Sequence, residues 1–289
     1  MRRLRHGNFC PAISRPQQGL QTATDLPDCS RPLKPQQTAQ TTTYLMEWFY
    51  VPALAEVSQG VGIGSEVDLP EAEARHCLTV LRHREGDVLH LVDGCGGRGE
   101  ARLVQADKRQ VRAVITAFER DAPDPAVAIH LAIAPVKNPA RMEWFLEKAT
   151  EIGVSCITPV WTQRGERRHG SSDRWQRVLV AAMKQSGRSW LPELREPIKF
   201  SDLMRSATEP CRLIAHCGPG ERRSVLQAAQ PGQPALLLVG PEGDFSPDEV
   251  ALAESAGFVP VHLGASRLRT ETAGVVAVHL LNLAGAVGA

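Results

Sequence analysis

The chain has 289 residues, with 33 Lys and Arg against 32 Asp and Glu and a hydrophobic content of 43%. These values are typical of a globular protein with ample core. No run of about 18 apolar residues occurs, so we predict no membrane span. The seven cysteines are scattered, odd in number and without a C-x-x-C pair. We therefore expect no disulfide framework, no metal site and a reducing, cytoplasmic compartment.

Residues 1–45 differ from the rest of the chain. They hold six Lys and Arg but only two acids, are rich in Gln, Thr and Pro, and show no sustained apolar period. This composition predicts a disordered extension. It is either an organelle transit segment or an upstream extension before a start at Met46; the dominance of Pro and Gln favours the second. Residues 46–289 carry a net charge of −3, so any nucleic-acid contact depends on local basic patches.

Short alternating apolar runs with turns follow between residues 46 and 125. Strands are predicted at residues 48–51, 66–69, 88–92, 101–105 and 111–118. A helix is predicted at 71–82, with Pro70 at its start. Gly94, Gly96 and Gly99 fit a dinucleotide-binding spacing, but a strand rather than a helix follows them, so we interpret them as a hairpin turn. These elements predict a small β-barrel domain, which ends at a Pro- and Asp-rich linker, residues 121–125.

From residue 126 the pattern changes to alternating strands and helices. Strands are predicted at residues 128–135, 156–161, 212–216, 235–239 and 258–263, and helices at 142–152, 172–185, 246–256 and 273–287. This alternation predicts a mainly parallel sheet covered by helices. The last helix is strongly apolar, which is typical of a core or subunit-interface helix. We thus expect a second, α/β domain at residues 126–289.

Two small-residue loops follow strands in the last part of the chain. Gly240-Pro-Glu-Gly243 and Gly264-Ala-Ser266 both come at strand ends, where open α/β sheets bind ligands, so one composite pocket is expected. The amides of the first loop could hydrogen-bond an adenine edge or a ribose, whereas Ser246 fits the N-cap of the next helix and is assigned to the scaffold. The string Arg267–Thr272 is either a charged helix start or a functional element built on Arg269 or Glu271, because buried charge is costly unless it is paired or used.

Basic residues gather in two clusters. The first contains Arg75, His76, Arg82, His83 and Arg84, and the second contains Arg164, Arg167, Arg168, His169, Arg174, Arg177, Lys184 and Arg188. Two clusters on a net-acidic protein favour an elongated polyanion such as RNA. Solvated surface charge remains the alternative for several of them.

Several longer motifs resemble those of one protein family. They are Arg75-His-x-x-x-Val-Leu-Arg82, Gly86-Asp-x-x-x-Leu-x-Asp-Gly94, Arg141-Met-Glu-Trp144, Glu147-Lys-Ala-Thr-Glu-Ile-Gly153, Gln185-Ser-Gly-Arg188, Gly240-Pro-Glu-Gly243 and Leu268-Arg-Thr-Glu-Thr-Ala273. In this order and over nearly all of residues 47–285, the chain resembles the RsmE family, bacterial 16S ribosomal RNA (uracil-N3)-methyltransferases of the SPOUT superfamily. Asp244 departs from the pattern, because the family usually has a second glycine there.

The resemblance implies a fold, a cofactor and partners. The fold is an α/β SPOUT-type trefoil-knotted methyltransferase domain preceded by a PUA-like β-barrel that helps to bind RNA. The cofactor is S-adenosylmethionine, and the partners are 16S rRNA or the small ribosomal subunit and a second copy of the chain in a homodimer, without metal. A SPOUT-type 2′-O-ribose RNA methyltransferase and a non-catalytic RNA-binding assembly factor remain alternatives.

The resemblance also implies site residues. Arg269 is expected to align or stabilise the uracil, and Glu271 either to hold Arg269 or to act as a base. The cofactor is expected at Leu238, Gly240, Pro241, Glu242, Gly243, Leu263, Gly264, Leu268, Thr272 and Ala273. RNA contacts are expected from Arg75, Arg82, Arg84, Arg164, Arg167 and Arg188.

Overall fold

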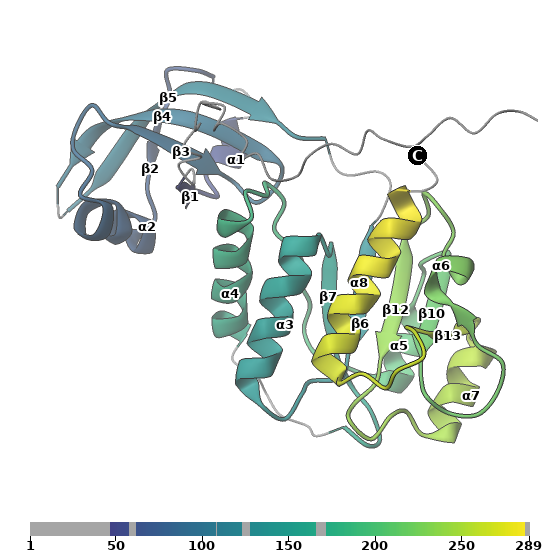
Figure 1. Ribbon diagram of the computed structural model, residues 1–289. Coiled ribbons are helices and arrows are strands. Elements are labelled where there is room, and N and C mark those ends of the chain that lie inside the picture. The colour runs from purple at the N-terminus through teal and green to yellow at the C-terminus, as the bar shows by residue number, and fades with distance from the viewer. Residues whose placement is uncertain (1–46, 58–61, 108, 123–127, 166–171, 287–289) are drawn as a thin grey trace, which may run out of the picture. The chain divides into compact units, whose positions relative to one another are not determined.

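The computed structural model describes residues 47–57, 62–107, 109–122, 128–165 and 172–286 (Figure 1). The predictions made for residues 1–45, and for the linker beyond residue 122, lie outside these ranges. Within them, every helix is too short or too polar to cross a membrane.

A five-stranded sheet is built from the first part of the described chain. Its strands are β1 (Trp48–Tyr50), β2 (Glu66–Asp68), β3 (Val88–Val92), β4 (Gly97–Ala106) and β5 (Val111–Arg120), in the order β1-β3-β4-β5-β2. Only the β1–β3 pair is parallel. All five predicted strands are present, and a short helix α1 (Leu54–Val57) was not predicted.

The predicted helix at 71–82 changes its winding after one turn. It consists of α2 (Glu71–Arg75) and a π-helical segment η1 (His76–Leu81), and it ends at Arg82 in the left-handed region with φ 59°. Pro70 occupies the N-cap position and Glu71 is the first helical residue. The proline therefore lies one residue before the first helical position, which proline prefers.

Alternating burial along β4 and β5 gives this sheet one apolar face. From Gly97 to Leu103 and from Val111 to Ile115 every second residue is buried, as the two-residue period of a strand requires, and Phe49, Leu89, Leu103 and Ile115 belong to one core cluster. The glycine motif turns between antiparallel β3 and β4, with Gly94 and Gly96 at positive φ. The hairpin interpretation of this motif is therefore confirmed.

An eight-stranded parallel sheet follows. Its strands are β6 (Ile129–Ile133), β7 (Cys156–Trp161), β8 (Glu193–Leu194), β9 (Ile198–Lys199), β10 (Cys211–Ala215), β11 (Arg223–Ser224), β12 (Ala235–Val239) and β13 (Val259–His262). The order is β11-β13-β10-β12-β6-β7-β8, with β9 also paired to β7. The predicted parallel sheet is confirmed; β8, β9 and β11 were missed because each has only two residues.

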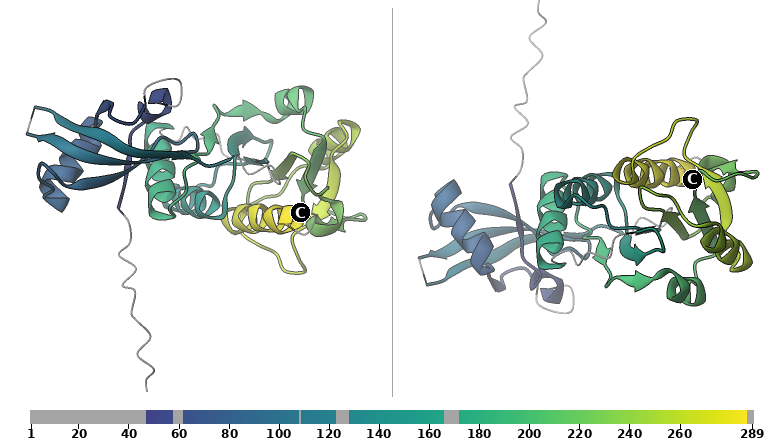
Figure 2. Two further views of the ribbon diagram at one scale, coloured as in Figure 1. Left: turned by 90° about the horizontal axis from the view of Figure 1, so that it is seen from above. Right: turned by 90° about the horizontal axis from the view of Figure 1, so that it is seen from below.

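Helices cover both faces of this sheet (Figure 2). They are α3 (Pro139–Ile152), α4 (Ser172–Gln185), α5 (Phe200–Ser206), α6 (Val225–Ala228), α7 (Pro247–Ser255) and α8 (Thr270–Ala286). Two of them, α5 and α6, were not predicted, and α8 begins three residues earlier than the sequence indicated. The Ser246 prediction is confirmed: its hydroxyl accepts from Glu249 N at 3.2 Å, and Glu249 Oε2 accepts from Ser246 N at 2.9 Å.

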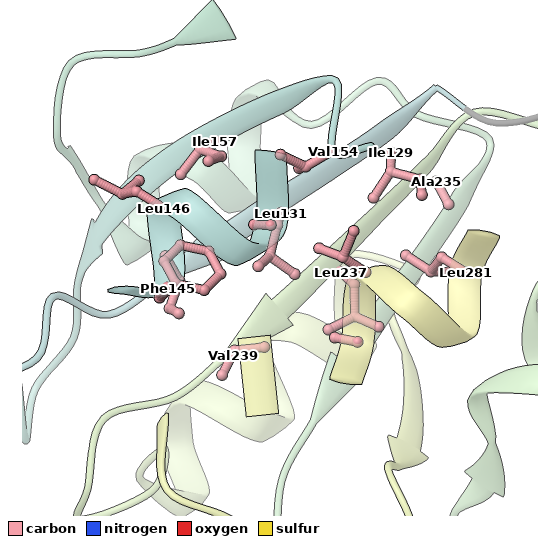
Figure 3. Close-up of a cluster of buried hydrophobic side chains, with 14 of the residues drawn as sticks. Ile129, Leu131, Phe145, Leu146, Val154, Ile157, Ala235, Leu237, Val239 and Leu281 are labelled. Carbon is pink, nitrogen blue, oxygen red and sulfur yellow. The ribbon is translucent and has the colours of Figure 1, made fainter. Parts of the chain in front are cut away.

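Alternate residues of the central strands divide the core into two layers. In β12, Leu237 and Val239 face the cluster shared with α3, α4 and α8 (Figure 3), whereas Leu236 and Leu238 face the cluster shared with α5 and α7. Both faces are apolar because a parallel sheet between two helix layers exposes neither side to water.

Close packing fixes the position of α8. Gly274 of α8 is buried, and a Cβ at this position would lie 2.6 Å from the Phe145 ring of α3 and 2.9 Å from Ile133 Cδ1 of β6. Glycine thus lets α8 approach β6 and α3. That approach places the start of α8 at the carboxyl edge of the sheet.

Candidate functional site

A cleft lies at the carboxyl edge of β13, β10 and β12, three strands that are neighbours in the sheet (Figure 1). Because these strands are parallel, the loops that follow them meet at one edge, where open α/β sheets bind ligands.

Three loops and the start of α8 line the cleft. The lining residues are Ala215, His216, Cys217, Arg222, Val239, Gly240, Pro241, Glu242, Asp244, Val261, His262, Leu263, Gly264, Ser266, Arg267, Leu268, Thr270 and Ala273. Of the residues expected to hold a cofactor, seven are among them: Gly240, Pro241, Glu242, Leu263, Gly264, Leu268 and Ala273. Leu238, Gly243 and Thr272 are not; the side chain of Leu238 lies in the core, and Gly243 is exposed beside Arg164.

The loop after β10 was not identified from the sequence. Its first residue, His216, is 7% exposed, and its Nδ1 accepts from Gly218 N at 3.1 Å. Its Nε2 is buried without a hydrogen-bond partner. Burial lowers the pKa of His216, partly opposed by the Asp244 carboxylate, so the imidazole is neutral. Cys217, Gly218 and Gly220 directly after a predicted strand were the available signal for this loop.

Hydrogen bonds join the cleft loops to the scaffold. Thr270 Oγ1 of α8 donates to Gly240 O at 3.1 Å in a buried position. A Cβ at Gly240 would lie 3.1 Å from the Phe245 ring, so a larger residue would push against this ring. Arg164, following β7, donates from Nη1 to Gly243 O at 3.0 Å. The first glycine loop is therefore held from two sides.

The two residues expected to act in catalysis differ in burial: Arg269 is exposed and Glu271 is buried. Arg269 is exposed at the edge of the cleft region, immediately before α8, and its carbonyl accepts from Ala273 N. Glu271 is 5% exposed, and its Oε2 has no hydrogen-bond partner. Its Oε1 lies 3.6 Å from Nε of Arg141 on α3. The structure thus brings together the motifs that contain Arg141 and Glu271, a contact that the sequence did not predict.

The residues expected to contact RNA lie in different settings. Arg75, Arg82 and Arg84 are exposed on or near the helix of the first sheet, and Arg75 pairs with Glu71 at 2.8 Å. Arg164 contacts the first glycine loop, as described above. Arg188 is partly buried, with its guanidinium close to Gly153. Arg167 lies outside the described residues.

The described cysteines, Cys77, Cys95, Cys156, Cys211 and Cys217, are free thiols. Within the described ranges, no group of His, Cys, Asp and Glu side chains has the arrangement of a metal site.

Comparison with known proteins identifies both parts of the chain. A family model described as an RNA methyltransferase domain matches residues 123–282, and one described as an RNA methyltransferase PUA domain matches residues 69–116. Ribosomal RNA small subunit methyltransferase E of Synechocystis is 30% identical over 254 residues, covering 86% of this chain and 81% of the relative.

Solved structures give the same result. A probable rRNA-methyltransferase from Porphyromonas gingivalis superposes with a TM-score of 0.76 and 38% identity, covering 83% of this chain and 99% of that one. A ribosomal RNA small subunit methyltransferase E from Neisseria gonorrhoeae, bound to S-adenosyl methionine, gives 0.72 and 31%, covering 82% and 97%.

The parallel sheet with its three-loop cleft and the accompanying PUA-type sheet define an RNA methyltransferase. The expected fold class is confirmed as an α/β RNA methyltransferase domain accompanied by a PUA-like domain. The chain belongs to the ribosomal RNA small subunit methyltransferase E family.

Proposed function

We propose that the chain transfers a methyl group from S-adenosylmethionine to N3 of a uridine in 16S ribosomal RNA. The observation that carries this proposal is the cleft formed by the loops after β10, β12 and β13. Relatives named ribosomal RNA small subunit methyltransferase E, one of them solved with S-adenosyl methionine, support the cofactor and the RNA class.

The chemistry of the cleft fits this cofactor. An amino-acid-substituted nucleoside needs apolar walls for its base and polar groups for its ribose and charged end. Val239, Leu263 and Leu268 supply apolar surface, and Glu242 and Arg267 supply charge. The buried imidazole of His216 has an Nε2 without a partner, the kind of group that a ligand or a local rearrangement must satisfy.

We propose that the seven expected residues that line the cleft contact the cofactor directly. Backbone groups of Gly240, Glu242 and Gly264 would hold its polar parts, and Leu268 and Ala273 its apolar surface. Bound S-adenosylmethionine supplies an electrophilic methyl group on a positively charged sulfur. For Leu238, Gly243 and Thr272 the proposal is restricted to backbone or indirect contacts.

The uridine must be activated by the protein. Its N3 is a weak nucleophile while protonated and lies on the pairing edge, so the base must be unpaired and lose that proton. We propose that Arg269 stabilises the anionic uracil, since a guanidinium favours charge that develops beside it. The buried Glu271 holds Arg141 at the same edge of the sheet, and the N3 proton leaves to water as the anion forms.

RNA binding, assembly and location complete the proposal. Arg75, Arg82, Arg84, Arg164, Arg167 and Arg188 are proposed RNA contacts, Arg164 in addition to its loop contact. The barrel (46–125) and the α/β part (126–289) are proposed as separate domains.

A homodimer is supported by exposed apolar side chains on adjacent helices, Trp144 of α3 at 43% and Leu283 of α8 at 42% exposure. Free thiols and an rRNA substrate support a cytoplasmic location.

Mass mapping of rRNA nucleosides from a deletion strain tests the activity. Loss of one 3-methyluridine, restored by the wild-type gene, is the expected result. Loss of a ribose methyl group would instead indicate 2′-O-methylation, and an unchanged nucleoside set would indicate a non-catalytic assembly factor.

The assignment of Arg269 is tested with purified protein. Arg269→Ala is expected to abolish methyl transfer while calorimetry shows unchanged S-adenosylmethionine binding. Arg205→Ala is the matched control and should keep full activity, because the Arg205 side chain is exposed and α5 lies on the other face of the sheet. Turnover by Arg269→Ala at the wild-type rate would remove Arg269 from the mechanism.

A further inference from the structure

Asp244 occupies an unusual backbone conformation in the cleft. Among the described residues, it and Arg82 are the non-glycine residues with positive φ, and its value is 62°. The left-handed region costs an L-residue about 1–2 kcal/mol, although Asp tolerates it better than most. Unlike the glycine that the family usually has there, Asp244 has a side chain that can form interactions in the cleft.

The Asp244 carboxylate joins two of the three cleft loops. Its Oδ1 accepts from the following amide, Phe245 N, at 2.8 Å, and its Oδ2 accepts from Cys217 N, in the loop after β10, also at 2.8 Å. Hydrogen bonds to a carboxylate are stronger than those between neutral groups. The two bonds offset the backbone cost and fix the carboxylate in place.

These bonds also hold a negative charge at the wall of the cleft. Asp244 lines the cleft and is only partly exposed. Its electrostatic effect reaches the neighbouring His216, whose pKa it raises against the larger lowering by burial. The fixed carboxylate is thus a source of negative potential inside the site, where a group in a partly desolvated cleft acts more strongly than one in water.

We propose that Asp244 is a specificity-determining residue that favours the cationic methyl donor over its demethylated product. This inference rests on the proposed function. The donor and the product share the adenosine and the amino-acid group, and they differ by the methyl group and the positive charge on sulfur. A fixed carboxylate in the cleft attracts the charged form and adds nothing for the neutral thioether. Replacement of the bound product by a fresh donor is favoured for the same reason.

The test compares two dissociation constants, measured by calorimetry on the full chain. The ratio Kd(S-adenosylhomocysteine)/Kd(S-adenosylmethionine) is expected to fall roughly threefold to tenfold in Asp244→Asn, the range for one unit charge in a partly solvated cleft. Asn keeps the shape, one acceptor oxygen and tolerance of the left-handed region. Asp248→Asn, an exposed residue of α7 outside the cleft, is the control and should leave the ratio unchanged.

A second variant keeps the test decisive if Asp244→Asn folds poorly. Asp244→Gly suits a φ of 62° and removes the same charge, so its ratio should fall equally. A ratio that stays at the wild-type value or rises in the folded variants overturns the proposal. This includes the outcome in which the affinities for both ligands fall equally, which would mean that the carboxylate only holds the loops. Failure of the wild-type chain to bind either ligand would instead contradict the proposed function.

Discussion

The pairing of Glu271 with Arg141 makes a quantitative prediction. The carboxylate is buried at the start of α8, and its Oε1 lies 3.6 Å from Arg141 Nε. Replacing Arg141 by Met leaves a buried charge without its cation, a change that costs about 3–5 kcal/mol in fully buried pairs. The Arg141 side chain is 39% exposed, so water compensates in part, and we expect a loss of about 2 kcal/mol in the free energy of unfolding.

A double-mutant cycle isolates the interaction. Glu271→Gln should cost about 1 kcal/mol, and the double variant should lose no more than Arg141→Met alone, because the charge that needed compensation is gone. The expected coupling is about 1–2 kcal/mol, measured by urea-induced unfolding at neutral pH. Arg174→Met is the matched control: Arg174 pairs with Glu143 of α3 at 2.6 Å but is 62% exposed, so its loss should stay below about 0.5 kcal/mol. Additive losses in the cycle would refute the pairing.

Three further predictions concern stability. Gly274→Ala should lower the free energy of unfolding by about 1–3 kcal/mol through overpacking against Phe145; a gain in urea stability would contradict the tight α8 contact. Ser246→Ala should cost about 1 kcal/mol, seen as a lower Tm, because the capping box of α7 is lost. Burial lowers the pKa of His130 and of His216, so the unfolded chain binds protons that the folded chain does not. Stability should be complete above about pH 6.5 and decline as pH falls below it; a Tm that is flat between pH 7 and pH 5 would contradict neutral buried imidazoles.

Local signals accounted for the parts of the fold that the sequence predicted well. The bounds of β7, α4 and β12 agree with the prediction to the residue, because α4 carries a helical apolar period, β12 is a continuous apolar run, and polar or small residues follow the elements. The Ser246 capping box depends on contacts three residues apart, which a sequence displays directly. By contrast, the π-helical winding of η1 has no such local signature, so one regular helix was predicted.

The site was predicted incompletely because strand order is not local. The nearness of the two glycine loops in sequence indicated one pocket, which the cleft confirms. However, β13 does not pair with β12: β10 lies between them. The third loop, with His216 and Arg222, therefore enters the cleft from a part of the chain that precedes both glycine loops. The contact of Arg141 with Glu271 was not predicted for the same reason, since only the packing of α8 against α3 brings the two side chains together.

The cofactor cleft and the proposed RNA-binding surface differ in how firmly their residues are held before binding. Thr270 with Gly240, Asp244 with Cys217 and Arg164 with Gly243 fix the loops before any ligand arrives, so binding a small cofactor orders little further chain and loses little affinity to loop entropy. Arg269 and the arginines near α2, which we propose as RNA contacts, are exposed, so bound RNA would have to order their side chains. Affinity for the cofactor should then depend weakly on salt, and affinity for RNA should fall steeply with it, because phosphate contacts release counterions.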